Sequence, residues 1–155
     1  MIRLNRSLLR DERGASLVEL ALLLPVLSTV VIGVADVSRA YSQKLQLEQA
    51  AYRAIEKVQQ YQSTSSTVDT LKTEAANAAG ITQTSTNPNI TYTLYCDGAA
   101  QANYNTTCST GQVYQRYVTV DITSTFTPMF ASNKWPGSNS DGTYTLHGRA
   151  SLRTQ

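Results

Sequence analysis

Residues on which catalytic and metal sites depend are scarce in this chain. Among 155 residues there are two cysteines and one histidine, His147, too few donors for a metal site. The eight glycines are scattered and form no phosphate-binding loop, and no Gly-x-Ser-x-Gly motif frames a serine. We therefore expect no catalytic residue, no metal site and no cofactor, and we predict that the protein is not an enzyme.

Most of the chain carries no excess of positive or negative charge. The net charge is +2, and the excess lies in residues 1–14. Basic residues outnumber acidic ones there: Arg3, Arg6, Arg10 and Arg13, against Asp11 and Glu12. From Ala15 onward nine basic residues balance nine acidic ones, so no basic cluster indicates a nucleic-acid partner. We expect the following carboxylates on solvated faces: Asp36, Glu48, Glu56 and Asp121.

One long apolar run stands out from the polar remainder. It extends from Ala15 to Ala35, and as a helix these 21 residues would reach roughly 30 Å, enough to cross the core of a bilayer. Its one charged residue is Glu19, and an ionised side chain at the centre of a membrane helix costs about 2.5–3.5 kcal/mol. We therefore expect residues 15–35 to span a membrane, with Glu19 paired rather than facing lipid.

Gly14 and Glu19 give the start of this run a specific motif. A glutamate five residues after a glycine, at the opening of a membrane helix, resembles the processing site of type IV-like prepilins. The longer string GASLVELALLLP, from Gly14 to Pro25, is similar to TadE-like minor pilins or pseudopilins of tight-adherence (Flp) pili. The resemblance implies cleavage by a prepilin peptidase after Gly14 and a mature chain that begins at Ala15. The new amine at Ala15 would lie about one helical turn from Glu19, and the two charges could pair within one chain or between chains. We predict that the pair forms between chains and gives Glu19 a role in assembly.

Residues 1–14 have two further interpretations. Positive charge before an apolar run favours a cytoplasmic N-terminus. An uncleaved signal anchor and a removed signal peptide also begin in this way, as a prepilin leader does. The run is longer than the core of an ordinary signal peptide and continues without an Ala-x-Ala break, which favours the prepilin leader.

The resemblance also implies a function, a location and partners. It predicts a structural, non-catalytic minor pilin or pseudopilin that takes part in the assembly of a tight-adherence pilus. Such a protein crosses the inner membrane once, with a cytoplasmic N-terminus and a periplasmic or extracellular head. Its partners are a prepilin peptidase, other pilin or pseudopilin subunits, the pilus assembly machinery and inner-membrane lipid. The alternative is a membrane-anchored extracytoplasmic binding or adhesion module, which has no need for Gly14 and Glu19 at this spacing.

Pro25 lies inside the predicted membrane helix. A proline removes one helical hydrogen bond and clashes with the preceding turn, so we expect a kink or local melting there. Two roles are open for it. The bend is a passive feature of a membrane helix, or it lets neighbouring helices pack in a filament.

Residues 36–62 contain no glycine or proline and continue the helix as an amphipathic segment. One apolar stripe consists of Leu47, Ala51, Ala54, Val58 and Tyr61. A second stripe lies beside it and consists of Tyr41, Leu45, Tyr52 and Ile55. We expect both stripes to pack on one broad sheet. The alternative is that one stripe binds the head of its own chain and the other binds a neighbouring subunit.

Residues 63–155 have the pattern of a small head domain. A short helix is predicted from Val68 to Ala79, with Gly80 at its C-terminal end. Alternating residues then predict three strands, at 90–96, 113–126 and 143–152. The expected fold is α+β and pilin-like: a long membrane-spanning helix that continues into a head with a short helix and an antiparallel sheet of three to four strands.

The two cysteines, Cys96 and Cys108, lie in the predicted head. Outside the cytoplasm an even cysteine count favours a disulfide, and a loop this short would stabilise the domain by about 3 kcal/mol. Two free thiols and a metal site are the alternatives, the latter opposed by the shortage of other donors.

Overall fold

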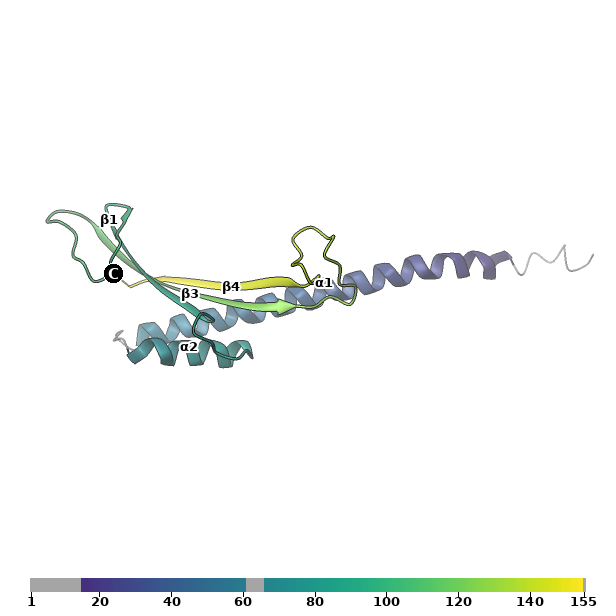
Figure 1. Cartoon of the computed structure of the whole chain (residues 1–155), viewed down its shortest axis with the longest axis horizontal. Helices are drawn as coiled ribbons and strands as arrows, with labels where there is room; N and C mark the ends of the chain where they lie inside the picture. Colours follow the sequence, from purple (N-terminus) through teal and green to yellow (C-terminus); the bar gives the residue numbers. More distant parts are fainter. Residues whose placement is uncertain (1–14, 61–65, 155) are drawn as a thin grey trace, which may run out of the picture. The chain divides into compact units, whose positions relative to one another are not determined.

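The computed structural model of the chain describes residues 15–60 and 66–154. Contacts divide the chain into two compact units that meet between Arg39 and Ala40. The helices and strands are α1 (Ala15–Gln60), α2 (Ser66–Ala79), β1 (Asn89–Cys96), β2 (Ala99–Ala100), β3 (Tyr114–Phe126) and β4 (Tyr144–Arg153) (Figure 1). The expected α+β layout is confirmed.

The N-terminal part of α1 is apolar around its whole circumference. All of its large apolar side chains from Leu17 to Val37 are exposed, apart from the half-buried Ile32. Within the described residues, α1 is the one helix long and apolar enough to cross a membrane. A helix that is hydrophobic on all sides needs an apolar surrounding, so this part of the chain has the character of a membrane anchor.

The sheet is antiparallel throughout, with strand order β2-β1-β3-β4. The three predicted strands are present, and each begins within one residue of its expected start. The fourth strand, β2, is two residues long and pairs with the end of β1. Ile90 lies opposite Val120, and Ile122 lies opposite Gly148, so these four residues share one face of the sheet.

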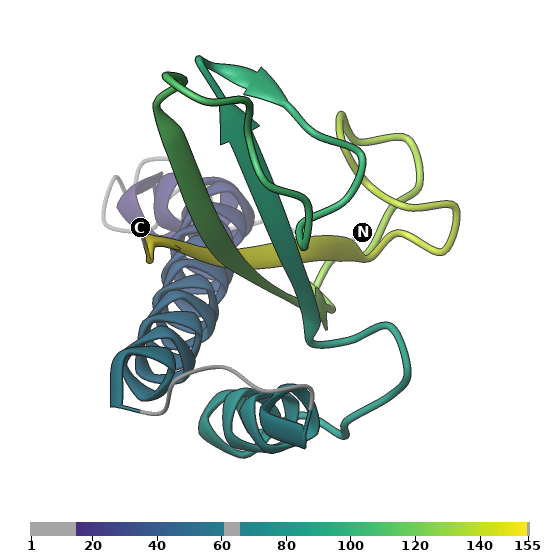
Figure 2. The same ribbon diagram turned by 90° about the vertical axis from the view of Figure 1, so that its left-hand side faces the viewer.

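Both helices cover that same face (Figure 2). Val118, Val120 and Ile122 of β3 are completely buried there. The helical side of the core consists of small residues and a few leucine and isoleucine side chains: Leu47, Ala50, Ala51, Ala54, Ile55, Leu71, Ala75 and Ala79. Small side chains let both helices lie close to the sheet, so a thin core suffices for a head of this size.

The expectation that both apolar stripes of the helix pack on the sheet is wrong. Leu47, Ala51 and Ala54 are buried, but of the second stripe only Ile55 is. The exposed fractions of Tyr41 and Tyr52 are 63% and 59%, and Leu45 is also exposed.

The position of α2 explains this exposure. Lys57 of α1 forms an ion pair with Glu74 of α2, and Gly80 lies beside Gln46. These contacts place α2 on the flank of α1 that contains Gln46 and Ala50, which belong to neither of the two predicted stripes. The opposite flank, with Tyr41 and Tyr52, is left uncovered by the described residues of the head.

The short helix ends as its sequence predicts, although it starts two residues earlier, at Ser66. Gly80 has a positive φ of 67°, a conformation that glycine adopts without steric cost. The Ile81 N–H donates to Ala76 O at 3.0 Å, and the Gly80 N–H donates to Asn77 O at 3.2 Å. This pair of bonds is a Schellman cap, which directs the chain away from α2 toward β1.

Candidate functional site

The predicted processing site lies at the edge of the described residues. Gly14 falls outside them, and Ala15 is the first residue of α1. Cleavage after Gly14 therefore stays a prediction.

Glu19 lies in the second turn of α1, with its side chain exposed. The side chains that follow it at Leu20, Leu22 and Leu23 are exposed and apolar. A carboxylate on such a surface needs a cation from elsewhere once lipid surrounds it, because an unpaired charge is costly in an apolar medium. Its role in assembly stays a prediction.

The helix continues without interruption through Pro25, so the expected local melting does not occur. The hydroxyls of Ser28 and Thr29 both donate to the carbonyl oxygen of Pro25, at 2.9 Å and 2.8 Å. These bonds satisfy both hydroxyls inside the helix, which lowers the cost of placing them in a bilayer. A kink at Pro25 stays a prediction.

Beyond the anchor, one flank of α1 forms an exposed stripe of Tyr41, Leu45 and Tyr52. Lys44 and Glu48 lie along the same region, with their charged atoms 3.7 Å apart. The stripe combines aromatic and aliphatic side chains with a neutralised pair of charges. Such a surface suits contact with another apolar helix better than contact with water.

Gly148 of β4 permits the opposite face of α1 to approach the sheet. A Cβ atom at this position would lie 2.5 Å from Leu47 O and 2.6 Å from Glu48 N. Both are backbone atoms of a helix, so they cannot rotate away. Any larger residue would push α1 off the sheet, and the position of the exposed stripe depends on this contact.

Cys96 and Cys108 form a disulfide, as predicted, with their Cα atoms 5.6 Å apart. The bond closes the loop between β1 and β3. Asp97 adopts a positive φ of 48° and supports the turn with two bonds: its N–H donates to Val113 O, and its carboxylate accepts from the Val113 N–H, both at 2.9 Å. The loop is therefore fixed to both strands.

Aromatic stacking holds the loop over the sheet. The rings of Tyr104 in the loop and Tyr92 in β1 have centroids 5.2 Å apart, and the guanidinium of Arg116 lies 5.2 Å from the centre of the Tyr104 ring. Burial, and next the neighbouring Tyr104, raise the pKa of the Tyr92 hydroxyl above its ordinary value. That hydroxyl is buried without a hydrogen-bond partner among the described residues.

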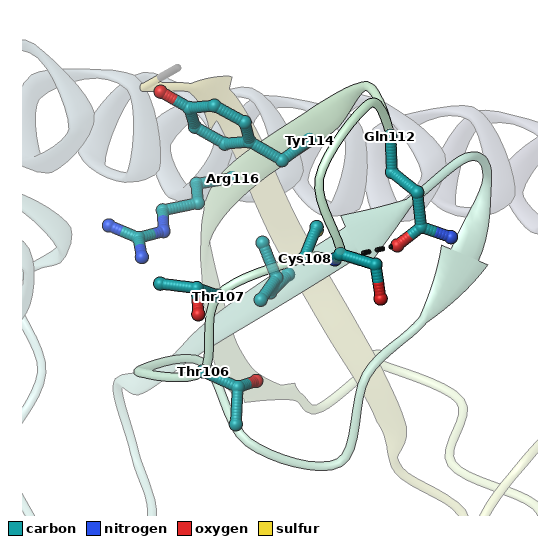
Figure 3. A pocket seen from close by; sticks show the side chains of 8 residues that line it. Thr106, Thr107, Cys108, Gln112, Tyr114 and Arg116 are labelled. Carbon is teal, nitrogen blue, oxygen red and sulfur yellow. Dashed lines mark hydrogen bonds between the residues drawn. The ribbon is translucent and has the colours of Figure 1, made fainter.

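A pocket of about 360 Å³ lies between this loop and β3 (Figure 3). The side chains of Tyr114 and Arg116 border it from the strand, and Thr106, Thr107 and Gln112 border it from the loop. The Gln112 side-chain oxygen accepts from the Ser109 N–H at 3.0 Å, which ties one wall together. The lining supplies hydroxyls, the Gln112 amide and the Arg116 guanidinium.

Asp121, His147 and Arg149 form a cluster on the uncovered face of the sheet, which we did not predict. Arg149 donates to Asp121 Oδ2 at 2.7 Å and 3.2 Å, and His147 Nδ1 lies 3.3 Å from Oδ1. Burial alone would raise the pKa of Asp121, but the bonds from Arg149 and His147 outweigh it and lower the pKa. The β3–β4 register, which puts Asp121 opposite Arg149, was the missing signal.

Among the residues that the structure describes, no three His, Cys, Asp or Glu side chains gather as they would around a metal ion. His147 is exposed and pairs with a carboxylate. The cluster joins the carboxylate of Asp121 to His147 and Arg149, so it has the composition of a surface ion pair.

The family model described as TadE-like protein matches residues 14–55 of the chain. The resemblance expected from the motif is therefore confirmed for the N-terminal segment, from the predicted cleavage site through most of α1. No curated protein and no solved structure matches the chain.

Proposed function

We propose that this chain is a minor pilin or pseudopilin of a tight-adherence pilus, with a structural and non-catalytic role. The observation that carries the proposal is the TadE-like match, because it starts at the glycine that a prepilin peptidase would recognise and includes the apolar helix. Association with a Tad pilus follows from that family likeness. Processing after Gly14 and the identity of individual partners go further and are proposed here.

The proposed organisation has four parts. Residues 1–14 are a leader, 15–35 cross the inner membrane, 36–62 continue the helix, and 63–155 form the head outside the cytoplasm. The arginines of the leader support a cytoplasmic N-terminus. The disulfide in the head supports its location in an oxidising compartment.

Cleavage would create the charge that Glu19 needs. A new α-amine at Ala15 would carry a positive charge, and it lies roughly 6 Å along the helix axis from Glu19. In apolar surroundings both groups seek a partner. An amine of one subunit paired with Glu19 of the next would set the axial register between two membrane helices, which lipid alone gives little reason to associate.

The exposed stripe supports a second contact between subunits. Tyr41, Leu45 and Tyr52 project from α1 on the flank that neither α2 nor the sheet covers. A neighbouring pilin helix is the partner that this surface fits, because a helix row of this spacing packs into the groove of another helix. The anchor would then set the register, and the stripe would extend the contact outside the membrane.

Intact-mass measurement of protein extracted from membranes tests the processing step. In cells that contain the pilus peptidase, the chain should begin at Ala15, and Gly14→Leu should accumulate as full-length precursor. A wild-type protein that still begins at Met1 in such cells would refute the prepilin interpretation.

Glu19→Gln tests the assembly step. It should leave cleavage and membrane insertion intact but reduce co-purification with partner pilins and the number of pili. Glu56→Gln is the matched control, because Glu56 is an exposed carboxylate of the same helix outside the anchor. Normal piliation with processed Glu19→Gln protein would remove the assembly role of this residue.

A further inference from the structure

The pocket between β3 and the loop of residues 97–113 is lined in part by buried and covalently fixed residues. Leu94 of β1 is 1% exposed, and Cys108 borders the cavity while it is bonded to Cys96. The volume of about 360 Å³ lies at the lower end of the roughly 300–1,000 Å³ that small-molecule pockets span. The pocket therefore accommodates one small molecule, or one unit of a polymer.

Four polar groups of the lining make no hydrogen bond to any residue that the structure describes. They are the hydroxyls of Thr107, Ser109 and Tyr114 and the side-chain nitrogen of Gln112. A hydroxyl both donates and accepts hydrogen bonds, and an amide nitrogen donates them. The lining therefore offers donors and acceptors at several separate points, which matches a molecule that carries several hydroxyls of its own.

The part of the loop that carries these groups is already ordered. The Gln112 N–H donates to Ser109 O at 3.1 Å, and the Ser109 N–H donates to the side-chain oxygen of Gln112 at 3.0 Å. Two further bonds join Asp97 to Val113 where the loop meets the strands. Because little ordering is left to occur on binding, a few hydrogen bonds are enough to give measurable affinity.

Arg116 adds a charged group to the pocket. Among the described residues that line the cavity it is the one charged side chain, and none is acidic. Its guanidinium lies 5.2 Å from the centre of the Tyr104 ring, a contact that holds it beside the loop (Figure 3). A planar guanidinium pairs with a carboxylate through two parallel hydrogen bonds. A ligand with both hydroxyls and a carboxylate would use both parts of the lining.

We propose that this pocket binds an acidic sugar, that is, a single sugar unit that carries a carboxylate. The sugar hydroxyls bond to the loop at Thr107, Ser109 and Gln112. The carboxylate pairs with Arg116, and the apolar C–H groups of the sugar ring lie against the aromatic ring of Tyr114. The inference goes beyond the proposed function, because it requires a folded head but neither cleavage nor a pilus.

Galacturonate, galactose and acetate separate the two parts of the lining. Each is titrated into isotope-labelled full chain in detergent micelles, and NMR spectroscopy follows the amide resonances of residues 106–116. We expect galacturonate to shift these resonances in a saturable manner, because it carries both hydroxyls and a carboxylate. Galactose should bind roughly tenfold more weakly, as expected when a charged hydrogen-bonded pair is lost, and acetate should not saturate the shifts.

Thr107→Val combined with Ser109→Ala tests the loop hydroxyls. Neither hydroxyl bonds to a described residue, so the variant should fold, and galacturonate should bind about tenfold more weakly, the loss expected for two hydrogen bonds. Thr110→Val is the matched control, because Thr110 is exposed on the same loop but does not line the pocket, and binding should not change. Arg116→Gln should reduce the preference for galacturonate over galactose to about one.

Three results would overturn the inference. Folded protein whose amide resonances do not shift with galacturonate would contradict it and leave the proposed pilus function intact. Equal affinity of the wild-type chain for galactose and galacturonate would remove the role of the carboxylate, a comparison that holds even if Arg116→Gln fails to fold. An equal loss of binding in Thr110→Val and in the double variant would show that the sugar does not bind in the pocket.

Discussion

The two parts of α1 share one continuous helical backbone but differ in how their apolar side chains are accommodated. Between Ala15 and Arg39 the helix presents large leucine and valine side chains on all sides, and these are exposed. Between Ala40 and Gln60 it buries mainly small residues, Ala50, Ala51 and Ala54, in the core of its own head. The anchor depends on a surrounding that other molecules supply. The second part depends on how closely a helix approaches a strand.

The sharpest test of this comparison is the same substitution at two glycines: Gly148 of β4, which lies against the second part of α1, and Gly33 in the first part. Gly148→Ala places a Cβ against helix backbone, and we expect the free energy of unfolding of the head to fall by about 3 kcal/mol or more. At Gly33 a Cβ meets nothing within 4 Å, so Gly33→Ala should change that free energy by less than about 1 kcal/mol. Denaturant unfolding of the full chain in detergent, followed by near-ultraviolet circular dichroism, measures both. Similar effects at the two positions would contradict the comparison.

Removal of the disulfide tests whether the far end of the head is stabilised independently of α1. Cys96→Ala combined with Cys108→Ala should lower the free energy of unfolding by about 2–3 kcal/mol, because the unfolded chain loses its closed loop. The same unfolding experiment on wild-type protein with a reducing agent is the control and should match the double variant. Far-ultraviolet circular dichroism should meanwhile show that α1 keeps its helicity. A wild-type protein indifferent to reduction would argue against the bridge.

Substitution of Tyr92 should change the free energy of unfolding by a smaller amount and should raise it. Its buried hydroxyl has no hydrogen-bond partner among the described residues, so Tyr92→Phe should raise the free energy of unfolding by up to about 1 kcal/mol. The variant keeps the ring that stacks on Tyr104. Tyr104→Leu, which removes the stacking, should instead destabilise the head. A loss of stability in Tyr92→Phe would mean that the hydroxyl is bonded after all.

The smallest effect concerns Asp121, on the face that neither helix covers. Its lowered pKa means that the folded protein binds the carboxylate proton more weakly than the unfolded chain does. This contribution to stability is therefore present above the unfolded pKa of about 4 and is lost as the pH falls through the lower, folded value. For a pair open to solvent we expect about 0.5–1 kcal/mol at neutral pH. Asp121→Asn should remove it, and unfolding measured from pH 2 to pH 7 should show a flatter profile than wild type.

Local patterns in the sequence were enough to predict the secondary structure. The uninterrupted helical period predicted α1, and Gly80 predicted the end of α2. The alternation of Val118, Val120 and Ile122 predicted the buried face of β3. The motif from Gly14 to Pro25 was also enough to identify the TadE-like segment. Each of these signals lies within one element, where spacing alone determines which residues share a face.

The features that the sequence did not predict depend on how helices and strands pack against one another. No pattern in the sequence shows that α2 packs beside Gln46 and Lys57 of α1, which leaves the flank with Tyr41 and Tyr52 uncovered by the described residues. In the sequence Gly148 is one small residue of a predicted strand. Only the close approach of the Leu47 backbone shows that a side chain has no room at this position. The partnership of Asp121 with Arg149 required a strand register that a long loop leaves undetermined.

The way in which α1 is attached to the rest of the head has a mechanical consequence. Gln43, Leu47 and Lys57 attach the helix to the rest of the head at successive points along its length. A force that draws α1 along its own axis, as extraction of a subunit from a bilayer would, loads these attachments together in shear. Peeling the helix away sideways would break them one after another. These attachments therefore resist tension along the axis of α1 better than a sideways pull on the helix.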